Sequence, residues 1–400
     1  MSEKHLKDHR EIGRKLDLFS FHEYAPGAIF WHPKGWIIYQ TLVNFIRKRS
    51  KAEGYLEIST PVMVKSLLYK NSGHWQHFGE NIFNLKVDGE DYSLKPMNCP
   101  ESTIIYGSKI RSYNDLPIKL SEFGILHRKE LSGVLGGALR VRQFVIDDAH
   151  LFVRPDQIQQ EIHKLLILTI EVYKSLNFKP RFYLATRPDK AMGDEITWKQ
   201  AESDLEKALK KAKVKYDIKP KDGAFYGPKI DIHIKDSQDR DWQLATIQLD
   251  FQIPKSMRLT YVDKDGSKKE PVMIHQGIFG SLERFIGIIT EHFQGAFPVW
   301  LSPIQVIVVP ISDKFTDYAQ KVASDIISNS IRCEVNIRNN TLPAKIRDAT
   351  LQKIPYICVV GQKEANSNKV SVRKLTGENL GGIQNKKFIQ RIKNEIANKT

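Results

Sequence analysis

The stretch that decides the fold is GILHRKELSGVLGGALRVRQF, residues 124–144. Strand-forming residues stand at both ends and a glycine-rich segment stands between them, which predicts a strand, a turn and a returning strand. Arg128 and Glu130 would then lie on one face of the first strand. Taken alone, this pair is explained by an ion pair between neighbouring strands as well as by a binding site.

Two further segments are equally ambiguous when each is taken alone. LEISTPVM, residues 56–63, follows a long predicted helix and forms a strand that ends at Pro61. GIFGSLERFIGIITEHF, residues 277–293, begins a predicted helix whose first turns carry Glu283 and Arg284. Charged residues are common on the surface at a helix start, so neither segment alone identifies a function.

The composition is that of a globular protein large enough for two domains. The chain has 400 residues, of which 41% are hydrophobic. No apolar run approaches the roughly 20 residues that span a bilayer, and the start MSEKHLKDHREIG lacks a signal or transit pattern. Three cysteines without a CxxC pair fit a reducing compartment. We therefore expect a cytoplasmic protein that does not enter a membrane.

The charge indicates a polyanionic partner. Lys and Arg number 61 against 46 Asp and Glu, a formal net charge of +15. Residues 301–400 hold 16 Lys and Arg against 8 Asp and Glu, so this quarter carries +8 of the total. Such an excess is typical of proteins that bind nucleic acid, although solubility alone also explains it.

A change of pattern near residue 300 predicts a domain boundary. The segment FPVWLSPIQVIVVPIS, residues 297–312, contains three prolines and leads into a predicted buried strand. Three strands and three helices then alternate, in IQVIVV, DKFTDYAQKVASDIISN, RCEVNIR, PAKIRDATLQKI, YICVVG and NKKFIQRIKNEIAN. Residues 301–400 are therefore predicted to form a small α/β domain with a mixed sheet covered by helices.

Residues 1–300 have a different pattern. Predicted helices at 35–54 and 155–176 are separated by clustered strand segments, at 57–63, 91–96, 118–128, 139–152, 229–236 and 241–251. Strands with few crossover helices favour an antiparallel sheet, so the fold class is α+β. The common phosphate-loop, dinucleotide, HExxH and GxSxG motifs are absent, so ATP would have to be bound in another way.

Together, the three segments resemble the three signature motifs of the class II aminoacyl-tRNA synthetases: a strand ending in proline, Arg-x-Glu, and Gly-x-x-Glu-Arg. Longer segments are similar to threonyl-tRNA synthetases in order and spacing, over essentially the whole chain: DHREIGRKLDLF, APGAIFWHPKGW, SGHWQHF, LKPMNCP, DLPIKLSEFGILHRKE, RVRQFVIDDAHLF, GAFYGPKIDI, QLATIQLDF and PVMIHQGIFGSLERFIGIITE. The resemblance implies a catalytic domain over 1–300 and an anticodon-binding domain over 301–400.

The resemblance implies ATP-dependent ligation of L-threonine to threonine tRNA through a threonyl-adenylate. Catalysis would consist of positioning the groups and stabilising negative charge, with Mg²⁺ on the phosphates. Arg128 matches the arginine on the α-phosphate, Glu130 and Phe144 the groups that hold adenine, and Arg140 and Arg284 further nucleotide-binding arginines. The implied ATP-binding set is Arg128, Glu130, Arg140, Phe144, Gln243, Thr246 and Arg284.

Cys99, His150 and His275 stand at the family's zinc-ligand positions, in KPMNCP, DDAHLF and VMIHQG. Their spacing alone follows no metal-binding rule and favours structural roles. A zinc ion with three protein ligands keeps an open position. In the family this position takes the amino group and hydroxyl of threonine, and an aspartate matched by Asp148 holds the ammonium. Valine would be rejected, whereas serine would be misactivated.

Other matched positions concern the amino acid and the tRNA. Tyr226 and Gln248 match amino-acid-binding residues, and His74 matches a histidine proposed to deprotonate the ribose hydroxyl, although packing explains a histidine next to a tryptophan equally well. The implied anticodon-contacting residues are Asn339, Arg347, Glu364 and Arg373. A homodimer is implied because the first motif builds the class II interface.

The sequence also departs from the family pattern. Glu101 and Ser102 replace a usual Gly-His, and Ile146 replaces a usual glutamine. The sequence starts at the entry to the catalytic domain, without the N-terminal editing region usual in the family, so we expect serine attached to tRNA not to be cleared by this chain. Rival interpretations are a synthetase-like regulatory or RNA-binding protein that has lost catalysis, and a class II enzyme for serine or proline.

Overall fold

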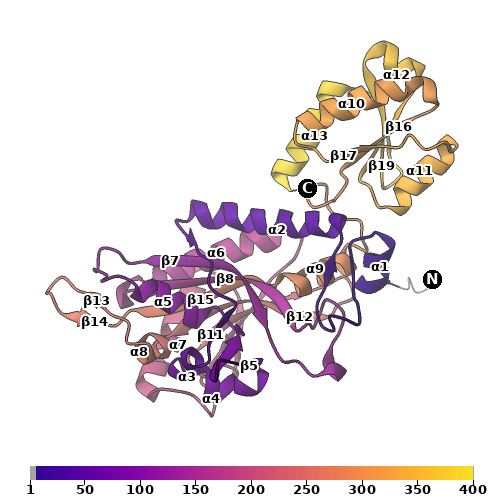
Figure 1. Cartoon of the computed structure of the whole chain (residues 1–400). Coiled ribbons are helices and arrows are strands. Elements are labelled where there is room, and N and C mark those ends of the chain that lie inside the picture. Colours follow the sequence, from indigo (N-terminus) through magenta and orange to yellow (C-terminus); the bar gives the residue numbers. More distant parts are fainter. Residues whose placement is uncertain (1–5, 400) are drawn as a thin grey trace. The chain divides into compact units, whose positions relative to one another are not determined.

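The computed structural model describes residues 6–399 (Figure 1). The chain divides into two compact units. The larger contains residues 21–29 and 43–288, and the smaller contains residues 6–20, 30–42 and 289–399. Two helices, α2 (Pro33–Ala52) and α9 (Leu282–His292), begin in one unit and end in the other.

An eight-stranded sheet is the centre of the larger unit. Its strands lie in the order β10 (Tyr216–Lys219), β9 (Arg181–Ala185), β11 (Lys229–Lys235), β12 (Asp241–Asp250), β15 (Val272–Ser281), β8 (Gln143–Val153), β7 (Ile118–His127) and β3 (Leu56–Glu57). All neighbours are antiparallel except the two edge pairs, β10 with β9 and β3 with β7. This confirms the predicted α+β class with a mainly antiparallel sheet.

Two amphipathic helices pack against this sheet: α6 (Ile158–Lys174) on β12 and β15, and α7 (Glu195–Lys211) on β9 and β11. Apolar side chains of α6, such as Ile162 and Leu166, are fully buried, as the helical spacing of apolar residues predicts. Asp194 caps the start of α7, because its carboxylate accepts a hydrogen bond from the backbone N–H of Thr197. The two helices thereby cover strands β9, β11, β12 and β15.

Shorter elements complete the larger unit. They include a three-stranded sheet in the order β4 (Met63–Lys65), β6 (Glu90–Leu94), β5 (Asn84–Val87), and the hairpin of β13 (Tyr261–Val262) and β14 (Lys268–Lys269). The short helices are α3 (Leu67–Asn71), α4 (His74–Phe78), α5 (Cys99–Gly107) and α8 (Gln252–Ser256), with 3-10 turns η1 (Gly79–Asn81), η2 (Ser132–Val134) and η3 (Pro155–Gln157).

The smaller unit contains a five-stranded mixed sheet, as predicted for residues 301–400. The order is β17 (Cys333–Val335), β16 (Val306–Pro310), β18 (Tyr356–Val360), β19 (Lys369–Lys374), β20 (Asn379–Gln384). The first three strands are parallel and the last two are antiparallel to their neighbours. Helical elements are η4 (Asp313–Phe315), α10 (Thr316–Ser328), α11 (Leu342–Leu351), α12 (Gln362–Ser367) and α13 (Asn385–Asn398). Also in this unit are α1 (His9–Lys15) and the pair β1 (Phe19–Ser20) and β2 (Phe30–Trp31).

The predicted strands and helices of residues 301–400 are confirmed, although β17 is shorter than the segment RCEVNIR. Strands β19 and β20 were not predicted, because their exposed positions and the paired glycines Gly381 and Gly382 weaken the apolar pattern. None of the helices formed by the described residues combines the length and the apolar character needed to cross a lipid bilayer.

Candidate functional site

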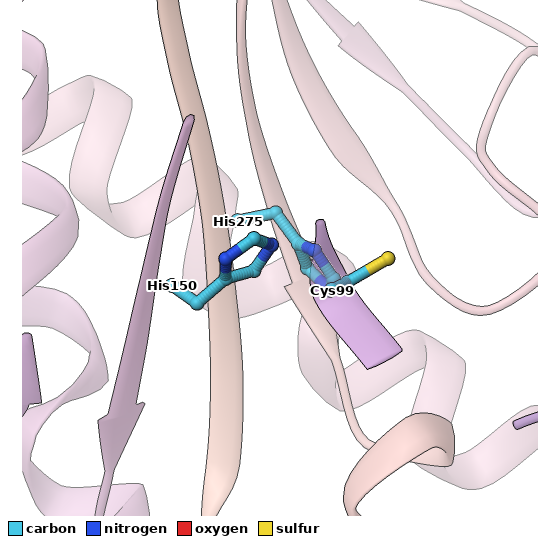
Figure 2. Close-up of side chains that lie close together, drawn as sticks. All are labelled: Cys99, His150 and His275. Atoms are coloured by element: carbon cyan, nitrogen blue, oxygen red, sulfur yellow. The ribbon is translucent and has the colours of Figure 1, made fainter. Parts of the chain in front are cut away.

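Two neighbouring central strands bring the two predicted histidine ligands together. His150 on β8 and His275 on β15 are direct cross-strand partners, and their ring centroids lie 5.0 Å apart. Cys99 is the first residue of α5. The potential ligand atoms of the three buried residues all lie within 4.8 Å of one another, and Figure 2 shows the three side chains close together. The structure therefore assembles a group that is scattered in the sequence.

The chemistry of this group fits a zinc ion. One thiol and two imidazoles supply the sulfur and nitrogen donors that zinc binds, and three protein ligands leave a fourth position of a tetrahedral site open. Burial raises the pKa of the Cys99 thiol well above its usual range and lowers the pKa of His150 well below. A bound cation would oppose the first shift by stabilising the thiolate.

Two of the candidate ligands have buried polar partners. Nε2 of His74 lies 3.2 Å from Sγ of Cys99, and Nδ1 of His74 lies 2.9 Å from the hydroxyl of Ser72. On the other side, Nε2 of His275 lies 2.9 Å from Oδ2 of Asp250. The sequence interpretation missed Asp250; its only sequence signal is an aspartate at the end of a strand and the start of a short helix.

The environment of His74 bears on the proton-removing role that the resemblance implies. The side chain is fully buried, and burial lowers its pKa to about 3, with a smaller contribution from His275. His74 is therefore neutral near pH 7. In this conformation its two ring nitrogens face Cys99 and Ser72, and the residue is not part of the pocket wall described next.

A pocket of about 330 Å³ opens beside the three candidate ligands. All three candidate ligands line it, as do the predicted residues Arg128, Asp148, Tyr226, Thr246 and Gln248. Ile146, which stands where the family pattern has a glutamine, also lines it. The structure thus brings together the predicted metal ligands, the predicted amino-acid-binding residues and two of the predicted nucleotide-binding residues. The Tyr226 hydroxyl donates a hydrogen bond to Oε1 of Gln248 in one wall.

Asp148 is held in this pocket by a residue that the sequence interpretation also missed. Nδ2 of Asn98 donates a hydrogen bond of 3.1 Å to Oδ2 of Asp148. A Cβ atom on Gly124 would lie 1.9 Å from Oδ1 of Asn98, so glycine at the start of the opening stretch makes room for this contact. Burial raises the pKa of Asp148 to about 6, and the bond from Asn98 opposes that shift.

The arginine and glutamate of the opening stretch have separate environments. The guanidinium of Arg128 lies over the rings of Phe144 and Phe78, at 5.0 and 5.3 Å from their centroids. Glu130 pairs with Arg140 across the turn, with 2.8 Å between Nη2 and Oε2. A nucleotide that used both Glu130 and Arg140 would compete with this ion pair.

The remaining predicted nucleotide-binding residues lie outside the pocket wall. Gln243 on β12 donates a 2.6 Å hydrogen bond to Asp231 on β11. The guanidinium of Arg284 lies 5.3 Å from the ring of Trp242, and its Nε is buried with no hydrogen-bond partner among residues 6–399. Glu283 accepts a hydrogen bond from the backbone N–H of Val145, which joins the start of α9 to β8.

Glu101 and Ser102, which replace the Gly-His usual in the family, are buried on α5. The hydroxyl of Tyr69 donates a 2.6 Å hydrogen bond to Oε1 of Glu101, and the hydroxyl of Ser102 donates to the carbonyl of Cys99 at 2.8 Å. Both departures therefore have local partners, and the Ser102 bond lies within the turn that carries the candidate metal ligand.

The four predicted anticodon-contacting residues lie on the smaller unit but not all at the same end of its strands. Asn339 follows the C-terminal end of β17, and Glu364 on α12 follows the C-terminal end of β18. Arg373 pairs with Ile357, near the N-terminal end of β18. Asn339, Arg373 and Arg347 on α11 are exposed, whereas Glu364 is half-buried and accepts a hydrogen bond from the backbone N–H of Gly361.

Comparison with known proteins gives two family matches. Residues 83–293 match the tRNA synthetase class II core domain (G, H, P, S and T), and residues 305–395 match an anticodon binding domain. The threonine–tRNA ligase of Caldanaerobacter subterraneus is 49% identical over 399 residues, and that of Carboxydothermus hydrogenoformans is 46% identical over 399. Each alignment covers all of this chain, which spans 62% and 63% of these two relatives.

A solved structure is also similar over nearly its whole length. The RNA binding domain of threonyl-tRNA synthetase from Cryptosporidium parvum superimposes with a TM-score of 0.94 at 39% sequence identity. The match covers 97% of this chain and 98% of that one.

Proposed function

Because the chain belongs to the threonyl-tRNA synthetases, a family of class II aminoacyl-tRNA synthetases, we propose that it ligates L-threonine to threonine tRNA with ATP, through a threonyl-adenylate. Residues 1–300 would carry the ligation and residues 301–400 would bind the anticodon. The observation that carries the proposal is the buried Cys99, His150 and His275 group in the wall of a pocket that also contains Asp148.

Cys99, His150 and His275 would hold a zinc ion whose open position binds the amino group and hydroxyl of threonine. Asp148 would accept hydrogen bonds from the ammonium, and the donor from Asn98 keeps its carboxylate in place. Tyr226 and Gln248 would close the wall around the amino acid. Valine matches threonine in size but lacks the hydroxyl, so this site discriminates by chemistry and not by volume.

Arg128 would neutralise charge at the α-phosphate, since its planar guanidinium suits a phosphate oxygen and lines the same pocket as Asp148. Arg284 and Arg140 would bind the rest of the triphosphate together with Mg²⁺. Glu130 and Phe144 would hold adenine, with Gln243 and Thr246 on strand β12. Positioning of this kind requires no general base for adenylate formation.

For the transfer step we propose that the terminal ribose approaches Tyr226 and Gln248. A proton-removing role for His74 requires a conformation in which Nε2 leaves Cys99, because the ring is fully buried as it stands. Asn339, Arg347, Glu364 and Arg373 would contact anticodon bases, and flanking lysines the phosphates.

We also propose a cytoplasmic homodimer. The edge strand β3 supports the dimer, because it ends the eight-stranded sheet and its residue Leu56 is 63% exposed. The three free cysteines are consistent with the cytoplasm.

The proposal is tested by aminoacylation. Purified protein with ATP, Mg²⁺ and radiolabelled threonine should charge a threonine tRNA transcript, and a serine tRNA transcript should stay uncharged. A protein that binds the threonine tRNA but forms no threonyl-tRNA would instead be the RNA-binding protein that has lost catalysis.

A further inference from the structure

We propose that Asp250 is a positioning residue for the metal site, which fixes the ring of His275 so that Nδ1 is the atom offered to zinc. The inference rests on the proposed zinc site and deepens it. It concerns a residue two positions beyond the predicted amino-acid-binding Gln248, on the same strand.

The register of the sheet brings Asp250 to His275. On β12 and β15, Gln248 pairs with His275 and Asp250 pairs with Met273, so Asp250 is the diagonal neighbour of His275 on the same face. The Asp250 side chain is fully buried, and its Oδ2 lies 2.9 Å from Nε2 of His275. The contact is therefore built into strand pairing and does not depend on a mobile loop.

The carboxylate of Asp250 is itself held in place. Its Oδ1 accepts hydrogen bonds from the backbone N–H groups of Gln252 at 2.7 Å and Ile253 at 3.0 Å, at the start of α8. Ile253 packs in the same buried cluster as Cys99. One carboxylate thus bonds both to the start of α8, which contributes Ile253 to the cluster of Cys99, and to the ring of His275.

The chemistry of this contact selects one tautomer of His275. With the Asp250 carboxylate as the acceptor in this contact, Nε2 of His275 is the donor and carries the hydrogen atom. Nδ1 then keeps its lone pair and is the only ring nitrogen that can bind a metal. A carboxylate behind a metal-binding histidine is a common arrangement, and its loss typically costs 10- to 100-fold in metal affinity.

His275 differs in this respect from His150. Among residues 6–399, the acidic oxygen nearest to His150 is Oδ2 of Asp148, 4.0 Å from Nε2, which is beyond hydrogen-bond distance. Asp148 is also the proposed ammonium partner, so it is not dedicated to the histidine. Asp250, in contrast, is not part of the pocket wall and faces the back of the His275 ring.

The chain offers a control in Asp236. This buried carboxylate also accepts from two backbone N–H groups, those of Gln238 and Arg240, and from one aromatic ring N–H, that of Trp242. The ring belongs to a tryptophan, which cannot bind a metal. Asp236 also pairs with the guanidinium of Arg240, at 2.6 Å from Nη2, so Asp236→Asn removes a buried carboxylate with at least as many partners as Asp250, without touching a candidate ligand.

The experiment measures zinc affinity directly, in full-length protein freed of metal. Zinc is titrated into the wild type, Asp250→Asn, Asp250→Ser and Asp236→Asn in competition with a chromophoric chelator, and Co²⁺ absorption spectra report the ligand geometry. The serine variant can still accept from the N–H groups that start α8 but is too short to reach His275. Circular dichroism checks folding before metal is added.

We expect a 10- to 100-fold weaker zinc affinity in both Asp250 variants, an altered Co²⁺ spectrum, and an affinity within about twofold of the wild type for Asp236→Asn. Folded Asp250 variants that bind zinc as tightly as the wild type would overturn the inference while leaving the zinc site intact. A wild type that binds no zinc would instead overturn the zinc site itself, and the inference with it.

Discussion

His150 and His275 are direct cross-strand partners on the neighbouring strands β8 and β15, with ring centroids 5.0 Å apart. This register brings two imidazoles to one point in a buried part of the sheet, and Cys99 joins them from the start of α5. Every prediction about threonine recognition below depends on this juxtaposition.

Cys99→Ser should remove the zinc site. A serine hydroxyl is a much poorer zinc ligand than a thiolate, so zinc content after gel filtration should fall close to zero. Threonine-dependent ATP–pyrophosphate exchange should fall by at least ~100-fold. Loss of a residue that only hydrogen-bonds to a metal ligand already costs up to about 100-fold in activity, and Cys99 is a proposed ligand itself. Cys333 is a half-buried cysteine on β17, and Cys333→Ser is the control. This variant should keep its zinc content and its exchange activity. Full exchange activity in zinc-free Cys99→Ser would contradict the assignment.

The wild-type site should accept serine and reject valine. Serine keeps the hydroxyl and loses one methyl group, so its kcat/KM for exchange should lie about 10- to 200-fold below that of threonine. Valine lacks the hydroxyl and should lie about 10⁴-fold below or lower. Steady-state exchange with the three amino acids gives both ratios. Equal discrimination against serine and valine would indicate a pocket that selects by size.

Arg373→Ala should weaken charging of threonine tRNA while ATP–pyrophosphate exchange stays nearly unchanged. The side chain is exposed on β19, in the smaller unit, whereas the residues proposed to activate threonine line the pocket of the larger unit. Arg373→Lys keeps the charge but loses the planar fork, so it should recover phosphate attraction without base recognition. An equal fall in exchange would refute an anticodon role for Arg373.

Glu283 should make folding stability depend on pH. Burial raises its pKa from 4.5 to about 7 in the folded chain, while hydrogen bonds from Val145 and Ser281 oppose the shift. The folded state therefore binds the proton more tightly than the unfolded state, and stability falls as pH rises from about 4.5 to about 7. The shift in the pKa of Glu283 corresponds to at most about 3 kcal/mol of unfolding free energy, at 1.36 kcal/mol per pKa unit.

Glu283→Gln keeps an acceptor for the N–H of Val145 but cannot ionise. Urea unfolding at pH 5 and pH 8 should show a smaller loss of unfolding free energy for this variant than for the wild type. Identical pH dependence in the two proteins would show that Glu283 does not titrate in this range.

Local patterns predict much of this fold, because each predicted helix and strand is defined by its own periodicity. The α2 and α6 helices and the β11 and β12 strands illustrate this. The order of strands could not be predicted in the same way. β15 lies between β12 and β8, although more than 100 residues separate β8 from β15 in the chain.

The candidate site was predictable only through resemblance, for the same reason. The spacing of Cys99, His150 and His275 follows no metal-binding rule, and their proximity arises from long-range strand pairing. Asn98 and Asp250 were missed because their roles depend on neighbours that only the folded chain supplies. The motif SGHWQHF likewise gave no sign that His74 is fully buried.

The most direct test of the account compares native, zinc-free and zinc-restored protein in threonine-dependent ATP–pyrophosphate exchange. We predict that chelation abolishes exchange with threonine and serine alike, that one equivalent of zinc per chain restores both, and that valine stays inactive throughout. Threonine-dependent exchange that persists at full rate in protein shown to contain no metal would contradict the claim that Cys99, His150 and His275 hold a zinc ion for threonine recognition.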